Sequence, residues 1–259
     1  MILTTIGDEI GNTLKEQIEV LKKANINYVE VRKINDKYLY DFSENEIKKI
    51  KHELDCNNIS VITVDTPIGK KKNAFNYEEN LKLLLQYLKI AQVFNAKYLR
   101  IFSDVGKVNN ECSIEEVLKE FSNLASEKSI EIIIENEKET FAQSTNVCGK
   151  LIRNLNNINI LFDVENSSNK NFNILGEYQN NKKKIKYIHL RDYDSNKQMY
   201  TYIGEGTLPL AELFKELKND NYNGVISLET MLPKYNKQDS KEKIFIESYS
   251  KFIRKYQEV

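Results

Sequence analysis

The sequence predicts a single (β/α)8 barrel, or TIM barrel, that spans residues 1–259. Three observations predict it. Eight strand-like segments recur at fairly regular spacing, each is followed by a stretch with helical periodicity, and the chain has the length that eight such units need. No low-complexity linker divides the chain, so we expect one domain.

The predicted strands are rich in β-branched and aromatic residues, and several are continuously apolar. Such runs are typical of parallel strands that are covered on both faces. In chain order the segments are residues 2–5, 26–32, 59–65, 97–102, 130–135, 158–163, 186–191 and 224–229.

Between the strands, apolar residues fall at helical spacing. Three such faces are Leu14, Ile18, Leu21 and Ala24; Leu81, Leu84, Leu88 and Ala91; and Ile244, Phe245, Tyr249, Phe252 and Ile253. Ser43 with Glu46, and Ser113 with Glu116, have the spacing of capping boxes that open helices. The stretch 170–180 has the weakest helical pattern. The competing architecture, a doubly wound open sheet, usually has a glycine-rich first turn, and no GxGxxG or GxxxxGK[ST] motif occurs.

Composition excludes several function classes. The 38 basic and 38 acidic side chains give a net charge of zero, which argues against a nucleic-acid-binding surface. No run of 18 apolar residues is present, and the first residues do not resemble a secretory signal. Cys56, Cys112 and Cys148 are widely spaced without a CxxC pair, so we expect reduced thiols and a cytoplasmic protein.

The ends of the predicted strands carry the candidate chemistry, because active sites of this fold lie at that face of the barrel. Glu135, Asp163 and Glu229 each end a strand, and His189 lies two residues before the end of another. Three carboxylates and one imidazole suit a divalent cation, with Mn²⁺, Mg²⁺ or Co²⁺ favoured and Zn²⁺ also open. The other histidine, His52, lies in a lysine-rich helical stretch and is expected at the surface.

At these residues the sequence resembles the sugar phosphate isomerase/epimerase family with the xylose isomerase-like TIM barrel. The resemblance covers nearly the whole chain and rests on short motifs that occur in the family's order and spacing. They are GDEIGNTLKEQIEVLKKANINYVEVR, VDTPIGK, YLRIFS, IIIENE, LFDVEN, YIHLRD, IGEGTLPL and GVISLET.

The resemblance implies one divalent metal ion held by Glu135, Asp163, His189 and Glu229. Glu135 and Glu229 would flank a sugar and transfer a proton at the carbon next to its carbonyl, through a metal-stabilised enediolate. The implied partner is a small carbohydrate, without nucleic acid or membrane, and relatives often form homo-oligomers. His189 would need a further partner for its second nitrogen, for which Asp192 is a candidate.

Six further residues are candidates for substrate binding: Asn166, Arg191, Arg32, Lys70, Arg100 and Glu205. Asn166 stands where relatives carry Asn or His, and Arg191 stands where many relatives carry lysine. Glu205 lies in a GEG turn and could reach the pocket from that loop. The basic residues could bind an anionic sugar. Alternatively they pair internally, Arg32 with Glu30 or Asp65, and Arg191 with Asp192.

Other functions stay open or are excluded. Glu229 precedes Thr-Met rather than the Pro-His often seen in relatives, which leaves the substrate pocket undefined. Abasic-site endonucleases of this fold use a histidine-rich three-metal cluster, which two histidines cannot supply. Two-metal xylose isomerase is longer and uses more ligands. A metal-dependent keto-polyol dehydratase would share the site, and a non-catalytic sugar-binding barrel is the alternative from another class.

Overall fold

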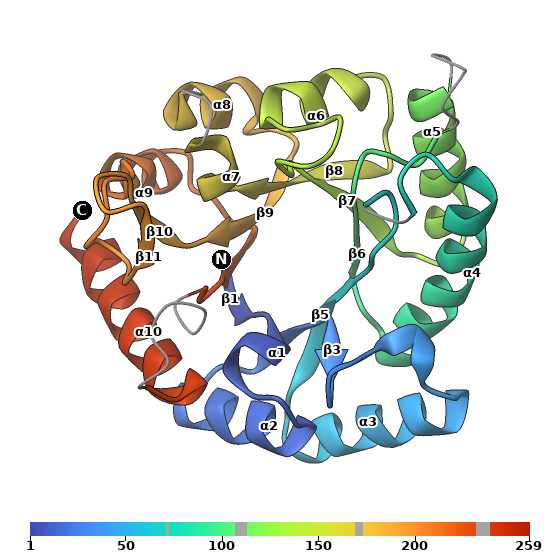
Figure 1. Ribbon diagram of the computed structural model, residues 1–259, viewed down its shortest axis with the longest axis horizontal. Helices are drawn as coiled ribbons and strands as arrows, with labels where there is room; N and C mark the ends of the chain where they lie inside the picture. Colours follow the sequence, from blue (N-terminus) through green and yellow to red (C-terminus); the bar gives the residue numbers. More distant parts are fainter. Residues whose placement is uncertain (71–72, 107–112, 169–172, 232–238) are drawn as a thin grey trace.

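A computed structural model describes residues 1–70, 73–106, 113–168, 173–231 and 239–259. Eight parallel strands form one sheet in the order β1-β12-β9-β8-β7-β6-β5-β2. A parallel bridge between Ile6 and Glu30 joins the two ends of this sheet, so the predicted TIM barrel is confirmed (Figure 1). The strands are β1 (Ile2–Thr5), β2 (Tyr28–Val31), β5 (Ser60–Asp65), β6 (Tyr98–Ile101), β7 (Glu131–Glu135), β8 (Ile158–Asp163), β9 (Ile185–Leu190) and β12 (Val225–Leu228).

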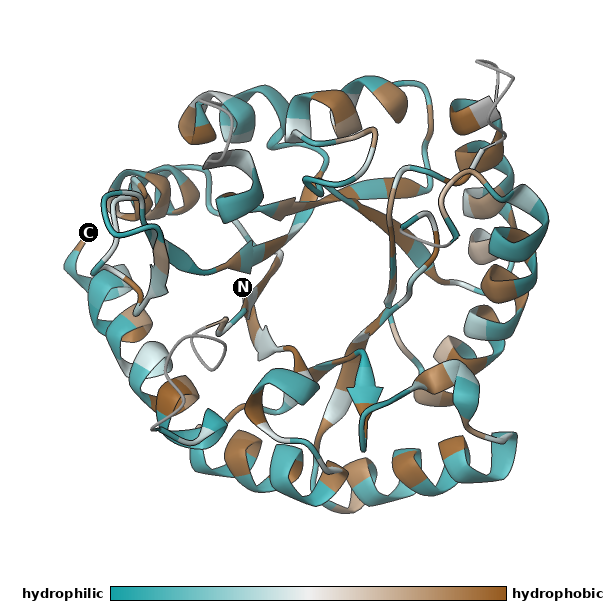
Figure 2. Ribbon diagram, viewed as in Figure 1, coloured by the Kyte–Doolittle hydropathy of each residue, from teal (hydrophilic) through white to brown (hydrophobic). Residues whose placement is uncertain are grey.

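Most of the helices form an outer ring around this sheet, and the two shortest α-helices lie inside that ring (Figure 1). The helices are α1 (Gly7–Ile10), α2 (Leu14–Lys23), α3 (Glu44–Cys56), α4 (Tyr77–Phe94), α5 (Ser113–Ser126), α6 (Thr145–Leu151), α7 (Val164–Ser168), α8 (Ile174–Asn181), α9 (Leu210–Asn219) and α10 (Lys241–Glu258), with a 3-10 turn η1 (Leu39–Asp41). Figure 2 shows apolar strands inside the ring and bands of polar and apolar residues along the helices, as amphipathic helices require. Within the described residues, no helix has the length and apolarity to cross a membrane.

The helix starts follow the capping rules that the sequence suggests. Ser43 and Glu46 form the predicted capping box of α3, and Thr13 with Glu16 forms a second box that the sequence analysis missed. The box predicted at Ser113 depends on a side chain outside the described set. The stretch 170–180, which has the weakest helical pattern, includes most of α8. Asn173 caps the start of this helix.

Two short hairpins at the mouth of the barrel were not predicted. The first is β3 (Lys33–Ile34) with β4 (Lys37–Tyr38), and the second is β10 (Asp192–Asp194) with β11 (Met199–Thr201). Asn35 and Asp36 in the first turn both have positive φ, near 53° and 59°, as a type I′ turn demands. Asparagine and aspartate tolerate this conformation, so the sequence carries a signal that strand periodicity alone overlooks.

The interior of the barrel contains two layers of different character. The apolar layer consists of Ile62, Tyr98, Ile133, Leu161, Tyr187 and Val225, all buried against one another. Residues two positions apart on a strand share a face, so the next inward positions of β6 to β9 are Arg100, Glu135, Asp163 and His189. With Glu30 and Asp65 they make up the charged layer, which is buried beneath the mouth of the barrel.

Candidate metal centre

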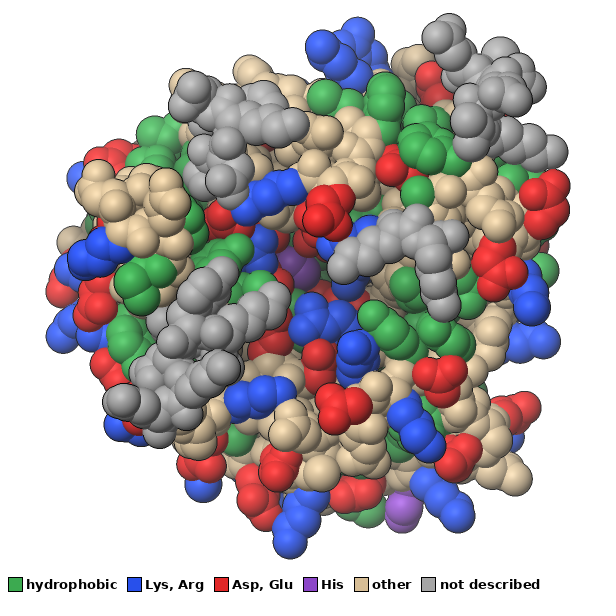
Figure 3. Space-filling model, in the orientation of Figure 1, with side chains coloured by type: hydrophobic (Ala, Val, Ile, Leu, Met, Phe, Trp, Pro, Cys, Tyr) green, Lys and Arg blue, Asp and Glu red, His purple; other side chains and the backbone are tan. Residues whose placement is uncertain are grey.

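Three candidate ligands converge in the charged layer. Glu135 ends β7, Asp163 ends β8, and His189 lies on β9, so neighbouring parallel strands deliver all three to one place. One donor atom of each lies within 4.8 Å of the other two, and all three residues are buried. Figure 3 shows acidic and basic side chains gathered around the barrel mouth above them.

The imidazole of His189 is oriented by a carboxylate on the opposite side of the barrel. Its Nε2 lies 2.9 Å from Oε1 of Glu30, and the hydroxyl of Tyr187 donates to Oε2 of Glu30 at 2.7 Å. The buried Nδ1 has no hydrogen-bond partner among the described residues, and it faces Glu135 at 3.7 Å and Glu229 at 4.0 Å. Burial lowers the pKa of His189, but Glu30 and Glu135 outweigh burial and raise it well above its usual value. Loss of the Nδ1 proton would leave the hydrogen on Nε2 and present the Nδ1 lone pair to a cation.

The candidate partner for His189 that the sequence suggested, Asp192, is wrong. Asp192 follows the end of β9 and accepts backbone N–H groups of Tyr193, Gly204 and Gly206 at 2.8–3.0 Å. Its carboxylate therefore orders the loop after β9. One interpretation of the basic residues expected Asp192 to pair with Arg191, but Arg191 contacts Asp163 and Glu229 instead.

Arg100 sets the electrostatics beside Glu135. Its guanidinium lies 2.7 Å from Asp65 and 3.3 Å from Glu135. Burial raises the pKa of Glu135, but Arg100 and His189 outweigh burial and lower the pKa to about 2. Burial also raises the pKa of Asp65 well above its usual value, against the opposing effect of Arg100, so Asp65 can share a proton with Glu30.

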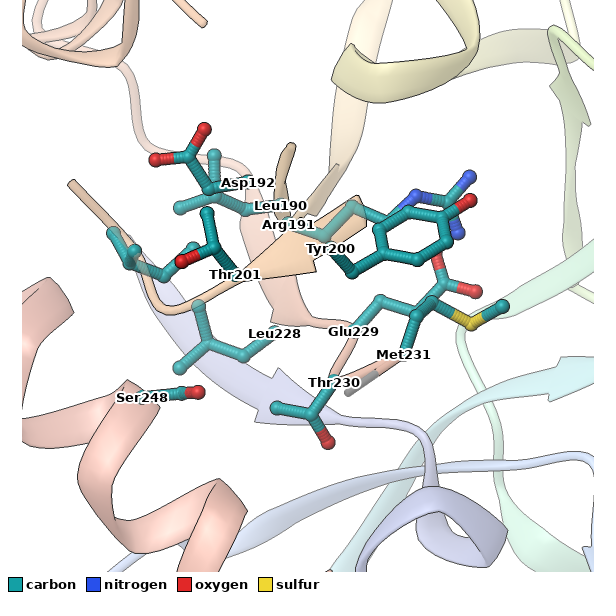
Figure 4. Close-up of a pocket in the computed structure, with 11 residues that line it drawn as sticks. Leu190, Arg191, Asp192, Tyr200, Thr201, Leu228, Glu229, Thr230, Met231 and Ser248 are labelled. Carbon is teal, nitrogen blue, oxygen red and sulfur yellow. The ribbon is translucent and has the colours of Figure 1, made fainter. Parts of the chain in front are cut away.

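The fourth candidate ligand, Glu229, lies just beyond β12 and outside the three-donor cluster. A guanidinium separates it from Asp163: Arg191 donates to Glu229 and lies 2.8 Å from Asp163 and 3.1 Å from Glu165. In Figure 4 the ends of Arg191, Tyr200 and Glu229 point to the same side, away from Asp192. Arg191 thus links Glu229 to Asp163 of the cluster, and Oε2 of Glu229 lies 4.0 Å from Nδ1 of His189.

The residues fit a divalent cation. Buried carboxylates outnumber the guanidinium groups that contact them, because Arg100 serves Asp65 and Glu135 while Arg191 serves Asp163, Glu165 and Glu229. Glu165 also contacts Lys138 at 2.6 Å, and burial together with Glu229 raises the pKa of Glu9 to about 7. An unpartnered imidazole nitrogen amid carboxylate oxygens is the donor set that such an ion prefers.

A cavity of about 1070 Å³ opens above this site. Five of the six predicted substrate-binding residues line it: Arg32, Lys70, Arg100, Asn166 and Arg191. Each of the four basic residues is already paired with a carboxylate, so internal pairing is the arrangement found.

The pairs of Arg32 and Arg191 differ from those expected. Arg32 contacts Asp8 at 2.9 Å and Glu9 at 3.2 Å, instead of Glu30 or Asp65, because those two carboxylates contact His189 and Arg100 deeper in the barrel. Lys70 pairs with Glu137, a residue of the loop after β7.

Glu205, the sixth predicted residue, does not line the cavity. Its exposed carboxylate contacts Lys251 on α10 at 2.5 Å, because the GEG turn packs outward against that helix. His52 is exposed on α3, as expected.

Sequence reasoning considered Glu30 only as a partner of Arg32 and missed its contact with His189. It also missed the rings of Tyr38 and Tyr40, which stack at the cavity wall with centroids 5.6 Å apart. Glu30 was detectable, because a charged residue between Val29 and Val31 interrupts an apolar strand.

Comparisons with known structures agree with this architecture. The IolI protein with a bound zinc atom shares 18% identity and a TM-score of 0.81, over 100% of this chain and 99% of that one. An L-ribulose 3-epimerase gives 12% and 0.78, over 100% and 95%. A probable 3-DHS dehydratase, AsbF, from Bacillus anthracis gives 12% and 0.76, over 95% and 98%. These likenesses show the fold, and a search among curated proteins finds no match.

The sequence itself identifies the family. The model of the xylose isomerase-like TIM barrel matches residues 18–255, which is most of the chain. The barrel topology and the motifs along its strands agree with that match. This chain therefore belongs to the xylose isomerase-like TIM barrel family.

Proposed function

We propose that the protein is a divalent-metal-dependent isomerase or epimerase of a small sugar. The observation that carries this proposal is the buried cluster of Glu135, Asp163 and His189, with the unpartnered Nδ1 of His189 facing two carboxylates. The cluster lies below a cavity large enough for a monosaccharide. Structural neighbours that are named as epimerases agree with this class of reaction.

Glu135, Asp163 and His189 would hold the ion. Glu229 would be a fourth ligand if its carboxylate contacted both the ion and Arg191. A bound cation would polarise the carbonyl of a sugar and stabilise negative charge on its oxygen.

The proton transfers fall to this chain's own carboxylates. Glu135 is ionised at neutral pH, since its pKa is about 2, and it can accept a proton from the carbon next to the carbonyl. Two carboxylates approach His189 from different sides: Glu229 comes from the β12 side, and Glu135 comes from the β7 side. The two are therefore suited to remove and return a proton on different sides of a substrate.

The cavity favours a polar, largely uncharged ligand. Its lining mixes ion pairs with aromatic rings, and Tyr38, Tyr40 and Phe102 could contact the C–H faces of a sugar. Because the four basic residues named above already have carboxylate partners, we propose neutral ketoses as the first substrates, with phosphorylated ketoses as the comparison.

Hydrogen exchange at carbon tests this proposal. The full chain, loaded with Mn²⁺ in D₂O, is incubated with neutral ketoses such as D-fructose and with their phosphate esters. Proton NMR then follows loss of the C–H signal beside the carbonyl. We expect exchange that EDTA abolishes and that Glu135→Gln slows by about 10²–10⁴-fold, the usual contribution of a general base.

A matched variant controls for the loss of a carboxylate. Glu131 begins the same strand and bonds Asn159 at 2.9 Å, so Glu131→Gln changes the same chemical group at the other end of β7. It should exchange at the wild-type rate. Unchanged exchange in Glu135→Gln would contradict the role of that residue, and a product that has lost water would indicate the dehydratase.

A further inference from the structure

Arg191 is buried among the candidate ligands and contacts several of them at once. The residue is 7% exposed. Its guanidinium contacts Asp163 at 2.8 Å, Glu165 at 3.1 Å and the side-chain oxygen of Asn166 at 3.2 Å, and it also donates to Glu229. Figure 4 shows this guanidinium beside the ring of Tyr200 and near the carboxylate of Glu229.

These contacts use the atoms that a metal ion would need. Oδ2 of Asp163 accepts from Arg191, and Oδ1 accepts the backbone N–H of Asn166 at 2.9 Å. On Glu229, Oε2 is the oxygen that accepts from Arg191 and that also lies 4.0 Å from Nδ1 of His189. Two of the four candidate ligands are thus partly neutralised by one cation.

The other buried guanidinium behaves differently. Arg100 makes its shorter contact, 2.7 Å, with Asp65, which is not a candidate ligand, and it lies 3.3 Å from Glu135. Of these two guanidinium groups, Arg191 is therefore the one that contacts two candidate ligands.

We propose that Arg191 is the resident counter-cation of the metal-free site: it holds Asp163 and Glu229 in place and weakens the binding of the metal. This inference rests on the proposed metal site. Without a counter-cation the carboxylates would repel one another in the metal-free protein. With it, an incoming divalent ion meets less negative charge and must share two ligands. Stability of the metal-free protein and affinity for the metal should therefore change in opposite directions when Arg191 is removed.

The test uses the full chain stripped with EDTA and then titrated with Mn²⁺ in a calorimeter, together with thermal unfolding with and without Mn²⁺. Arg191→Met removes the charge and keeps an unbranched side chain. We expect a lower Tm in EDTA, a Kd for Mn²⁺ that is about tenfold tighter, and a larger rise in Tm on adding Mn²⁺. The tenfold figure is an order of magnitude for one lost neighbouring charge.

Two further variants keep the result interpretable. Arg32→Met removes a guanidinium from the same cavity whose partners, Asp8 and Glu9, are not candidate ligands, so it should change the Kd less. Arg191→Lys keeps the charge but replaces the planar fork, and it covers the case in which Arg191→Met does not fold. It should lower Tm in EDTA and leave the Kd near that of the wild type.

The outcomes separate the two proposals. A Kd for folded Arg191→Met that is equal to or weaker than wild type overturns this inference alone. So does a Tm in EDTA for Arg191→Met that equals or exceeds that of the wild type, or, where that variant does not fold, a Kd for Arg191→Lys that differs from the wild type by tenfold or more. Failure of the wild-type protein to bind Mn²⁺ overturns the metal site, and this inference with it.

Discussion

The apolar layer and the charged layer of the barrel interior are built by the same strands, yet they have opposite chemistry. On β8 and β9, Leu161 and Tyr187 belong to the apolar layer, and Asp163 and His189 follow two residues later in the charged layer. A step of two residues along a strand therefore separates the apolar layer, which stabilises the barrel, from the charged layer, which we propose for catalysis. Substitutions in the apolar layer should therefore change the free energy of unfolding, and substitutions in the charged layer should change metal affinity.

Tyr187 connects the two layers. Its ring packs edge-on against Tyr98, with centroids 5.9 Å apart, and its hydroxyl reaches up to Glu30. Glu30 in turn orients His189. The apolar layer thus gives the charged layer a rigid base, which is what a metal site needs to hold its ligands in a fixed geometry.

The largest expected change in folding stability comes from the apolar layer. Leu161 is fully buried, so Leu161→Ala should lower the free energy of unfolding by about 2–5 kcal/mol, as cavity-forming substitutions do. Urea denaturation monitored by circular dichroism measures this. Leu85→Ala on the exposed side of α4, where the leucine is 44% exposed, is the control and should cost far less. Similar losses in both variants would mean that the apolar layer does not support the barrel.

A smaller and different effect should follow in the charged layer from Glu30→Gln. The amide keeps the shape but removes the charge that fixes the Nε2 hydrogen of His189. Affinity for Mn²⁺ should fall by about 10–100-fold, the usual effect of removing a partner that orients a metal ligand. Calorimetric titration measures it, with Glu131→Gln as the matched control. Unaltered affinity would show that Glu30 does not orient the imidazole.

The fold and the four candidate ligands were predicted for the same reason, and three of those four residues lie together in the structure. Strand periodicity marks where each strand ends, and the ends of parallel strands lie at one face of the barrel. The sequence alone therefore places Glu135, Asp163 and His189 at that face. β8 spans residues 158–163, as predicted, whereas β12 stops at Leu228 and leaves Glu229 just beyond it.

Pairing across the barrel could not be predicted in the same way. Which cation meets which carboxylate depends on side-chain direction and on loops that cross the mouth. The sequence places Arg191 next to Asp192, but the two side chains diverge, one into the barrel and one into a loop. Glu205 likewise lies in a motif of the family but packs against α10.

Metal stoichiometry tests whether the charged layer binds one divalent cation. The full chain and Asp163→Asn are stripped with EDTA, incubated with Mn²⁺, freed of unbound ion and analysed for manganese by elemental analysis. We expect one ion per chain for the wild type and a substoichiometric amount for Asp163→Asn, with both proteins folded by circular dichroism. Equal metal content in the two proteins, or none in the wild type, would contradict this expectation.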